Sequence, residues 1–192
     1  MDTATAVPPS TADHRRRLLD AMAQAVAGKG YAAVTIADLA AEARVSKRSF
    51  YEHFPDKAAC LIALYEAASR QSFDVLRDAI DPARDWHEQV EQALQAYFET
   101  LACNPPLLRT LFIEIAALGP QGLAARRRTT QQFANFIVRI TGSGLPLAQA
   151  TAIVGGIHEW VLEAVEQDRV AQLPALVKPA ARLVRAVVDH HA

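Results

Sequence analysis

Residues 47–54 place hydrogen-bond donors and aromatic rings on opposite sides of what reads as a short helix. Phe50 and Phe54 stand four positions apart, so both rings lie on one helical face and can anchor it in a core. The other face carries the donors Lys47, Arg48, Ser49, Tyr51 and His53. Lys and Arg can pair with guanine O6 and N7 in the major groove of DNA, and hydroxyl and imidazole groups can hold phosphates. The stretch therefore predicts contact with duplex DNA, the alternative being a solvated surface.

The sequence just before this stretch supplies the helix starts that would position it. Thr35 and Asp38 have the spacing of a capping box, in which the hydroxyl caps early N–H groups and the carboxylate reaches back. Ser46 is a favourable N-cap for the next helix. The N–H groups left free at both helix starts can donate to phosphate. We therefore expect Thr35 and Ser46 beside the DNA backbone, on two short helices joined by a turn.

Positive charge is local and is not a property of the whole chain. From Arg44 to Lys57 there are four basic and two acidic residues, whereas the 192-residue chain has a net charge of −1. Any nucleic-acid contact must then come from a basic patch. We expect Arg44 and Lys57 in that patch, although Lys57 can instead pair with a helix end. A second cluster, Arg15 to Arg17, opposes the dipole of the helix that it begins, which fits either a phosphate contact or a solvated face.

These residues fall at the fixed offsets of a known helix-turn-helix segment, and the matching positions are Gly30, Tyr31, Thr35, Ile36, Ala40, Val45, Ser46, Tyr51, Phe54, Lys57 and Leu61. With them, the stretch from about residue 14 to residue 62 resembles the TetR family of bacterial transcriptional regulators. The family usually has glycine just before the valine of the turn, where this chain has Arg44. A left-handed turn strains a residue other than glycine. Arg can instead adopt right-handed or bridge geometry, so the geometry of this turn stays open, and the Arg44 side chain is expected as an additional phosphate contact.

The whole chain reads as helical, because 51% of its residues are apolar and they recur every three or four positions. Breakers divide it into about nine expected helices, over residues 12–29, 35–43, 46–54, 56–80, 85–103, 107–117, 121–141, 147–167 and 173–190. We predict an all-α fold with three parts: a disordered leader over 1–12, a three-helix DNA-binding domain over 13–60 and a helical ligand-binding and dimerisation domain over 61–192.

Aromatic residues are frequent in the C-terminal two-thirds of the chain. The family resemblance implies a ligand cavity between its helices, of roughly 300–1,000 Å³ if typical. The rings expected to line it are Trp86, Tyr97, Phe98, Phe112, Phe133, Phe136 and Trp160. The polar residues that could orient a ligand are Glu114, Gln131, Asn135, His158 and Glu159. The alternative for each ring is a plain core, and for each polar side chain a place on the surface.

The eighth and ninth expected helices have the character of an interface. The eighth is apolar on more than one side, so it must be buried on two sides. Gly155 and Gly156 in its middle cost about 1 kcal/mol each relative to alanine, which close approach of two helices would explain. We expect half of a four-helix dimer interface, as the resemblance also implies, formed by Val154, Gly155, Gly156, Ile157, Val161, Leu183, Val184 and Val187. The alternative is the buried core of a monomer.

Other functions find little support in the residues. Cys60 and Cys103 form no CxxC pair, so neither a disulfide framework nor a zinc site is indicated, and no cofactor is expected. No apolar run approaches 18 residues, so no membrane span is expected. No nucleophile and base stand in a convincing arrangement, so an enzyme is not expected. The cysteine usage fits a reducing, cytoplasmic setting.

The sequence therefore predicts a ligand-responsive transcriptional regulator. Its partners would be a second copy of the chain, a palindromic DNA operator and a small, largely apolar effector. As a repressor, it would leave DNA when the effector binds. Two alternatives remain open: a helical binding protein or enzyme that keeps a vestigial helix-turn-helix, and a regulator that senses no ligand.

Overall fold

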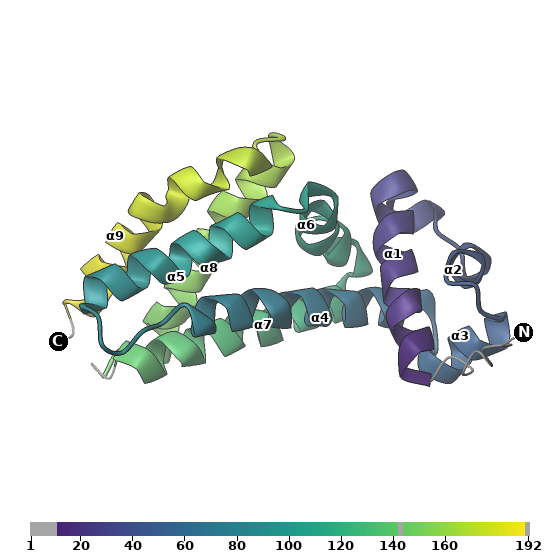
Figure 1. The fold of residues 1–192 in the computed structure, drawn as a ribbon, viewed down its shortest axis with the longest axis horizontal. Helices are drawn as coiled ribbons and strands as arrows, with labels where there is room; N and C mark the ends of the chain where they lie inside the picture. Colours follow the sequence, from purple (N-terminus) through teal and green to yellow (C-terminus); the bar gives the residue numbers. More distant parts are fainter. Residues whose placement is uncertain (1–10, 142–143, 191–192) are drawn as a thin grey trace, which may run out of the picture. The chain divides into compact units, whose positions relative to one another are not determined.

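A computed structural model describes residues 11–141 and 144–190 of the chain. In these residues there are nine α-helices and two short 3₁₀ helices, with no strand (Figure 1). The prediction of an all-α fold with about nine helices is therefore confirmed. The chain divides into two compact units, the first ending at Leu64 and the second beginning at Tyr65. The boundary falls within the long helix that spans Lys57–Asp78.

The first unit is a small bundle around buried apolar side chains. Its helices are α1 (Thr11–Ala33), α2 (Ile36–Glu42), α3 (Lys47–His53) and the first turns of α4 (Lys57–Asp78). Each helix contributes to the core, with Leu18, Met22, Leu39, Phe50 and Leu61 fully buried. The apolar positions recur at helical spacing, so the polar side chains between them are left on the outside. The core thus fixes which side of α3 faces outward.

Gly30 interrupts α1 near its end. Its φ of 73° and ψ of 153° are not helical, so the assigned helix continues to Ala33 only across a kink. Glycine adopts this backbone conformation without the steric penalty that a β-carbon would bring. The expected break at Gly30 is therefore present, and one more turn follows it.

The second unit contains the rest of α4 and all later helices. These are α5 (Trp86–Ala102), α6 (Pro105–Phe112), the 3₁₀ helix η1 (Glu114–Leu118), α7 (Pro120–Thr141), α8 (Leu147–Glu166), the 3₁₀ helix η2 (Val170–Leu176) and α9 (Val177–Val188). Helix α7 packs against α8, and α5 packs against α9 and η2 (Figure 1). Their inner faces form one continuous apolar core.

Two expected helices are each divided in the structure. Residues 107–117, expected as one helix, lie in α6 and η1, and α6 begins earlier, at Pro105. Proline is tolerated in the first turn because its missing N–H has no helical partner there, and the Asn104 side chain accepts from the Leu107 N–H at 3.1 Å. Residues 173–190 are likewise divided between η2, which contains Pro174, and α9.

The expected leader over residues 1–12 lies outside the described residues, apart from Thr11 and Ala12, which belong to α1. Among the helices that the structure describes, none is by itself long and apolar enough to cross a membrane; only the stretches Trp86–Ala102 and Pro105–Leu118 taken together reach that length and composition, with a bend of 100° between them.

Candidate functional site

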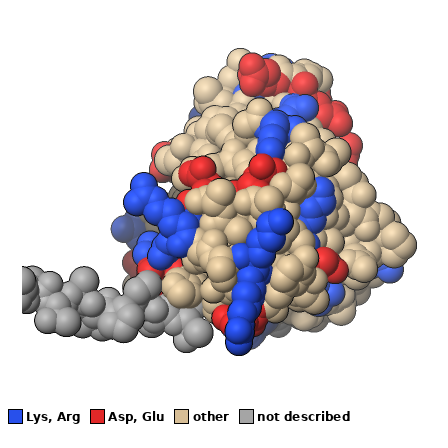
Figure 2. Space-filling view, turned by 90° about the vertical axis from the view of Figure 1, so that its right-hand side faces the viewer, with Lys and Arg blue, Asp and Glu red and all other residues tan. Residues whose placement is uncertain are grey.

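Helix α3 has a buried aromatic face and an exposed polar face, as its sequence predicts, with His53 as an exception. The rings of Phe50 and Phe54 are 0% and 4% exposed, whereas Tyr51 is 57% exposed. Lys47 and Arg48 are also exposed. Figure 2 views the molecule from the right-hand side of Figure 1 and shows rows of Lys and Arg side chains on that end, with a few acidic side chains among them. The outer face of α3 can therefore offer two cations and a phenol to a polyanion.

The serine hydroxyls at the start of α3 are engaged with the helix itself. The Ser49 N–H donates to the Ser46 Oγ at 3.0 Å, and the two hydroxyl oxygens are 3.1 Å apart. One turn later, the Arg48 Nε donates to the Glu52 Oε1 at 3.3 Å, and both side chains are exposed. An exposed pair of this kind is weak, so a phosphate or a base edge can replace Glu52 at Arg48.

The turn between α2 and α3 is clamped from α1 by Arg17. Its guanidinium donates to the Ala43 carbonyl and, at 2.8 Å, to the Arg44 carbonyl. Arg44 itself has a φ of 52°, so of the geometries left open for this turn the left-handed one is present. The left-handed turn is retained with a β-carbon in place, and the exposed Arg44 side chain points away from the core. Charge-assisted bonds to two carbonyls help to hold this strained turn.

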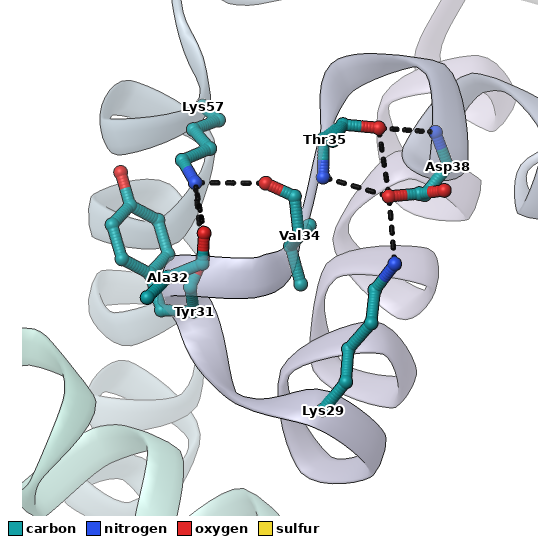
Figure 3. A network of polar contacts seen from close by, with 7 residues as sticks. All are labelled: Lys29, Tyr31, Ala32, Val34, Thr35, Asp38 and Lys57. Carbon is teal, nitrogen blue, oxygen red and sulfur yellow. Dashed lines mark hydrogen bonds and ion pairs between the residues drawn. The ribbon is translucent and has the colours of Figure 1, made fainter.

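Lys57, at the start of α4, binds the end of α1 (Figure 3). Its ammonium donates to the carbonyl oxygens of Tyr31 at 3.0 Å and Val34 at 2.7 Å. It also lies 4.3 Å from the centre of the Tyr31 ring. The sequence left two roles open for Lys57, a DNA contact or pairing with a helix end. In the structure its ammonium pairs with the end of α1 and not with an outward-facing partner.

The start of α2 is held by the predicted capping box (Figure 3). The Asp38 N–H donates to the Thr35 Oγ1 at 3.2 Å, and the Thr35 N–H donates to the Asp38 carboxylate at 2.8 Å. Lys29 of α1 adds an ion pair to that carboxylate at 2.8 Å. The hydrogen bonds from Lys29 and Thr35 hold the pKa of Asp38 well below its usual range. The Thr35 side chain therefore caps its own helix, and a phosphate at this position would be repelled by the negative charge of Asp38.

His53 does not share the outer face of α3. Its Nε2 is buried with no hydrogen-bond partner among the described residues. The ring packs edge-on against His14, with 6.4 Å between ring centres, and lies beside Phe54. The buried Nε2 cannot reach an anion outside the unit, so it does not support the expected phosphate contact of His53.

The second unit contains an apolar cavity that is partly open to solvent, with about 620 Å³ of atom-free space when the solvent at its opening is included. Four of the seven rings predicted from the sequence line it, namely Trp86, Tyr97, Phe133 and Phe136. Aliphatic side chains from α4, α5, α7, α8 and α9 complete the wall. Such a cavity suits a hydrocarbon or aromatic body, because apolar surface is transferred into it without loss of hydrogen bonds.

A smaller chamber of about 410 Å³ adjoins the apolar cavity. Tyr97, Phe133 and His158 line both spaces. The smaller chamber differs in chemistry, since its wall also contains Tyr65, Ser69, Ser72, Arg126 and Thr129. Phe112 belongs to this polar chamber and not to the apolar one. Phe98 and Trp160 line neither of the two spaces.

His158 sits at the junction of the two chambers. Its ring packs edge-on against Phe112 and Phe133, each with 5.8 Å between ring centres. Burial, with a smaller contribution from the charge of Arg126, lowers the pKa of His158 to about 4. The imidazole is therefore neutral at physiological pH and can donate or accept one hydrogen bond. Burial also raises the pKa of the Tyr97 phenol, which stays protonated.

The other polar residues singled out in the sequence lie away from the cavity. Gln131 and Asn135 are hydrogen-bonded to each other at 3.3 Å and line an open groove on the outer side of α7. Glu159 is exposed on α8, and Glu114 lies in η1. In the part of the chain that the structure describes, no three His, Cys, Asp or Glu side chains group as metal ligands.

Helices α8 and α9 expose fewer of the predicted interface residues than expected. Four of them are buried in the core of the protomer itself: Val154, Ile157, Val161 and Val184. Their burial within one protomer fits the alternative of a protomer core. Gly155 is exposed, and Gly156, Leu183 and Val187 are half-buried. A β-carbon at Gly155 would meet nothing within 4 Å, whereas one at Gly156 would lie 3.6 Å from the Leu183 side chain.

Two arginines that matter in the structure carry no distinctive signal in the sequence. Arg17 belongs to a basic run that looks like a solvated face, and its partners are 26 and 27 residues away. Arg126 opens a second run of three arginines and is the member that lines the polar chamber. Helical spacing could have suggested that Arg126 lies on the inner side of α7, since Thr129 and Phe133 follow at three and seven positions.

Comparison with known proteins finds a family model within the first unit and relatives that match longer parts of the chain. Residues 18–64 match a family model described as bacterial regulatory proteins of the tetR family. The nucleoid occlusion factor SlmA of Aliivibrio fischeri is 28% identical over 104 residues, which are 54% of this chain and 53% of SlmA. The transcriptional activator FasR of Mycolicibacterium smegmatis is 24% identical over 147 residues, 76% of this chain and 67% of FasR. The matched region spans about half the length of SlmA.

Solved structures extend the likeness to nearly the full length. The fatty acid degradation regulator FadR of Bacillus halodurans superposes with a TM-score of 0.77 at 23% identity, covering 89% of this chain and 94% of FadR. FadR of Bacillus subtilis, solved in complex with stearoyl-CoA, gives a TM-score of 0.76 at 20% identity and covers 88% and 96%. At these identities the structural likeness concerns the fold.

Proposed function

Because this chain belongs to the tetR family of bacterial regulatory proteins, we propose that it is a ligand-responsive repressor that binds a palindromic operator as a homodimer. The observation that carries the proposal is the arrangement of α3. Phe50 and Phe54 fix the helix in the core, and Lys47, Arg48 and Tyr51 are left exposed. A helix held in this way can enter the major groove with its hydrogen-bond donors facing the base edges.

Each exposed residue of α3 has a chemically suited role in the proposed complex. Lys47 and Arg48 lie at the start of the helix, the part that reads base edges in helix-turn-helix proteins, and both can pair with guanine. Tyr51 offers a phenol to a phosphate. Arg44, exposed in the turn, adds a cation for the DNA backbone. Two copies related by a two-fold axis would read two half-sites, with centres about 34–36 Å apart or slightly more.

The apolar cavity supports an effector with a largely apolar body. A ligand that binds one conformation of the dimer better than the other shifts the population between them. A preference of roughly 1–3 kcal/mol changes DNA affinity 5- to 150-fold. We infer that effector binding favours a separation of the two α3 helices that does not match the operator. The protein would act in the cytoplasm, where it has access to DNA.

The double variant Lys47→Ala/Arg48→Ala tests the role of α3. We expect it to bind DNA from the promoter beside its own gene at least about 100-fold more weakly in a gel shift, since each good base contact contributes about 1–3 kcal/mol. Its circular dichroism spectrum and oligomeric mass should be unchanged, because both side chains are exposed. Lys178→Ala/Arg182→Ala removes the same charge from exposed positions on α9 and should bind normally. Undiminished specific binding by the α3 variant would reject the proposed role.

A further inference from the structure

Arg126 is a half-buried cation that lines the polar chamber. Among the residues that the structure describes, it has neither an ion pair nor a hydrogen bond within the protein. The neighbouring Arg128 takes the Glu66 carboxylate at 2.7 Å, which leaves that acid engaged elsewhere. Arg185 shows the usual solution for a half-buried arginine, because it pairs with Glu91 at 2.8 Å and donates to the His87 carbonyl. Because no acidic side chain pairs with it, Arg126 is able to bind an anion that enters the chamber.

The surroundings of Arg126 fit one small anionic group. Neutral hydroxyls line the chamber with it, from Tyr65, Ser69 and Thr129. Thr129 is buried, and each hydroxyl can donate one hydrogen bond to an oxyanion. His158 is uncharged there, so Arg126 brings the one positive charge on the chamber wall. One guanidinium matches one carboxylate through two parallel hydrogen bonds, whereas a doubly charged phosphate would keep an unpaired charge.

The apolar cavity and the polar chamber are adjacent and share part of their walls. Tyr97, Phe133 and His158 form the shared wall, and beyond them the lining is almost entirely apolar. A ligand with an anionic head at Arg126 would therefore place its body among the side chains of Leu94 and Ile137. The two spaces together have the polarity profile of an amphiphile.

We propose that the cavity of the second unit binds a monocarboxylate with an apolar body, whose carboxylate pairs with Arg126. This inference rests on the proposed function in treating the cavity as the effector site. It goes further in assigning the chemical class of the effector and the residue that selects it. Arg126 then discriminates acids from uncharged molecules of the same shape, because an alcohol or an ester leaves the guanidinium unpaired.

The test is a calorimetric titration of the full chain with matched twelve-carbon probes below their micelle concentrations: dodecanoate, dodecanol and dodecanoyl-CoA. The wild-type protein should bind dodecanoate at least tenfold more tightly than dodecanol. Arg126→Gln should lose at least tenfold in dodecanoate affinity and leave dodecanol affinity unchanged, and Arg126→Lys should restore part of the loss. Arg127→Gln, which removes an exposed charge from the next position of α7, should behave as wild type.

Several outcomes would overturn the inference. These are equal affinity of the wild type for dodecanoate and dodecanol, unchanged dodecanoate binding by Arg126→Gln, and binding of dodecanoyl-CoA alone. Arg126→Gln should also be at least as heat-stable as the wild type without ligand, since it removes an unpaired charge; a loss of stability would indicate a partner within the protein and reject the anion site. A gel shift separates this inference from the proposed function: dodecanoate binding by a chain that does not bind DNA would reject only the function.

Discussion

Arg44 places a β-carbon on a backbone turn with a φ of 52°. This conformation costs an L-residue other than glycine roughly 1–2 kcal/mol. Glycine removes that strain, but it also loses more conformational entropy on folding, which offsets part of the stabilisation. We therefore predict that Arg44→Gly raises the free energy of unfolding by about 0.5–1 kcal/mol, measured by urea denaturation.

The matched control for this position is Arg44→Ala. It removes the same charge and keeps the β-carbon in the left-handed turn, so it should not be stabilised. If alanine and glycine at position 44 gave equal stability, the strain would not be the cause. Both variants would lose one cation near DNA, so a small and equal loss of operator affinity is expected for the two.

His158 makes stability depend on pH. Its pKa is about 4 in the folded chain and about 6.5 in an unfolded one. Between these values the unfolded chain binds a proton that the folded chain does not, so the free energy of unfolding falls as the pH decreases from about 6.5 to 4. We predict that the stability of His158→Gln relative to the wild type rises when the pH is lowered from 7 to 5. A difference in melting temperature that is the same at both pH values would show that the imidazole is not buried as described.

At the scale of elements, α3 is positioned by contacts from α1. Arg17 holds the carbonyl groups of the turn before α3 without belonging to the outer face. We predict that Arg17→Met lowers the free energy of unfolding by about 1 kcal/mol, a value below that of a buried charge-assisted bond because the side chain is partly exposed. Operator affinity should fall as well. The dependence of binding on salt should stay the same, since no phosphate contact is lost.

Arg16→Met is the control for Arg17. Arg16 is on the same turn of α1, is 71% exposed in its side chain and pairs with Asp13 at 2.8 Å. It should change neither stability nor the positioning of α3. A reduced salt dependence in Arg17→Met would instead mean that Arg17 itself binds phosphate.

The sequence predicts those elements that depend on nearby residues. The capping box of Thr35 and Asp38, the break at Gly30 and the two faces of α3 all follow from residues within a few positions of one another. The divisions at η1 and η2 were missed because apolar periodicity alone does not distinguish a short 3₁₀ segment from a continued helix.

The contacts that cross between elements could not be predicted in the same way. Lys57 reaches carbonyls 23 and 26 residues earlier in the chain, and its charge alone fits DNA equally well. The rings of the second unit show the same limit. Phe98 and Phe133 were both expected to line the cavity, yet of these two only Phe133 does, because this depends on how the helices pack around the space.

At the scale of the whole molecule, the proposed dimer rests on the outward side of α8. Gly155 is exposed there, with nothing within 4 Å of where a β-carbon would be. We predict that Gly155→Glu leaves the protomer folded and shifts the protein toward monomer in sedimentation velocity, because it introduces bulk and places like charges near each other across a two-fold axis. Operator affinity should fall in parallel, since one protomer contacts one half-site.

Gly28→Glu is the matched control for the interface. Gly28 is also an exposed helical glycine with open space around it, in α1, so the same substitution should leave the mass unchanged. If Gly155→Glu sedimented as the wild type, this face of α8 would not be the interface.

The most direct measurement is a nuclease footprint of the wild-type protein on the promoter DNA beside its own gene. Two copies of α3 held by a two-fold axis should protect two half-sites related by a dyad, with centres separated by about 10–10.5 base pairs, or slightly more, along the DNA duplex. Protection should weaken when a ligand fills the cavity. Protection of a single site without a dyad, or none at concentrations where the protein is dimeric, would contradict the account.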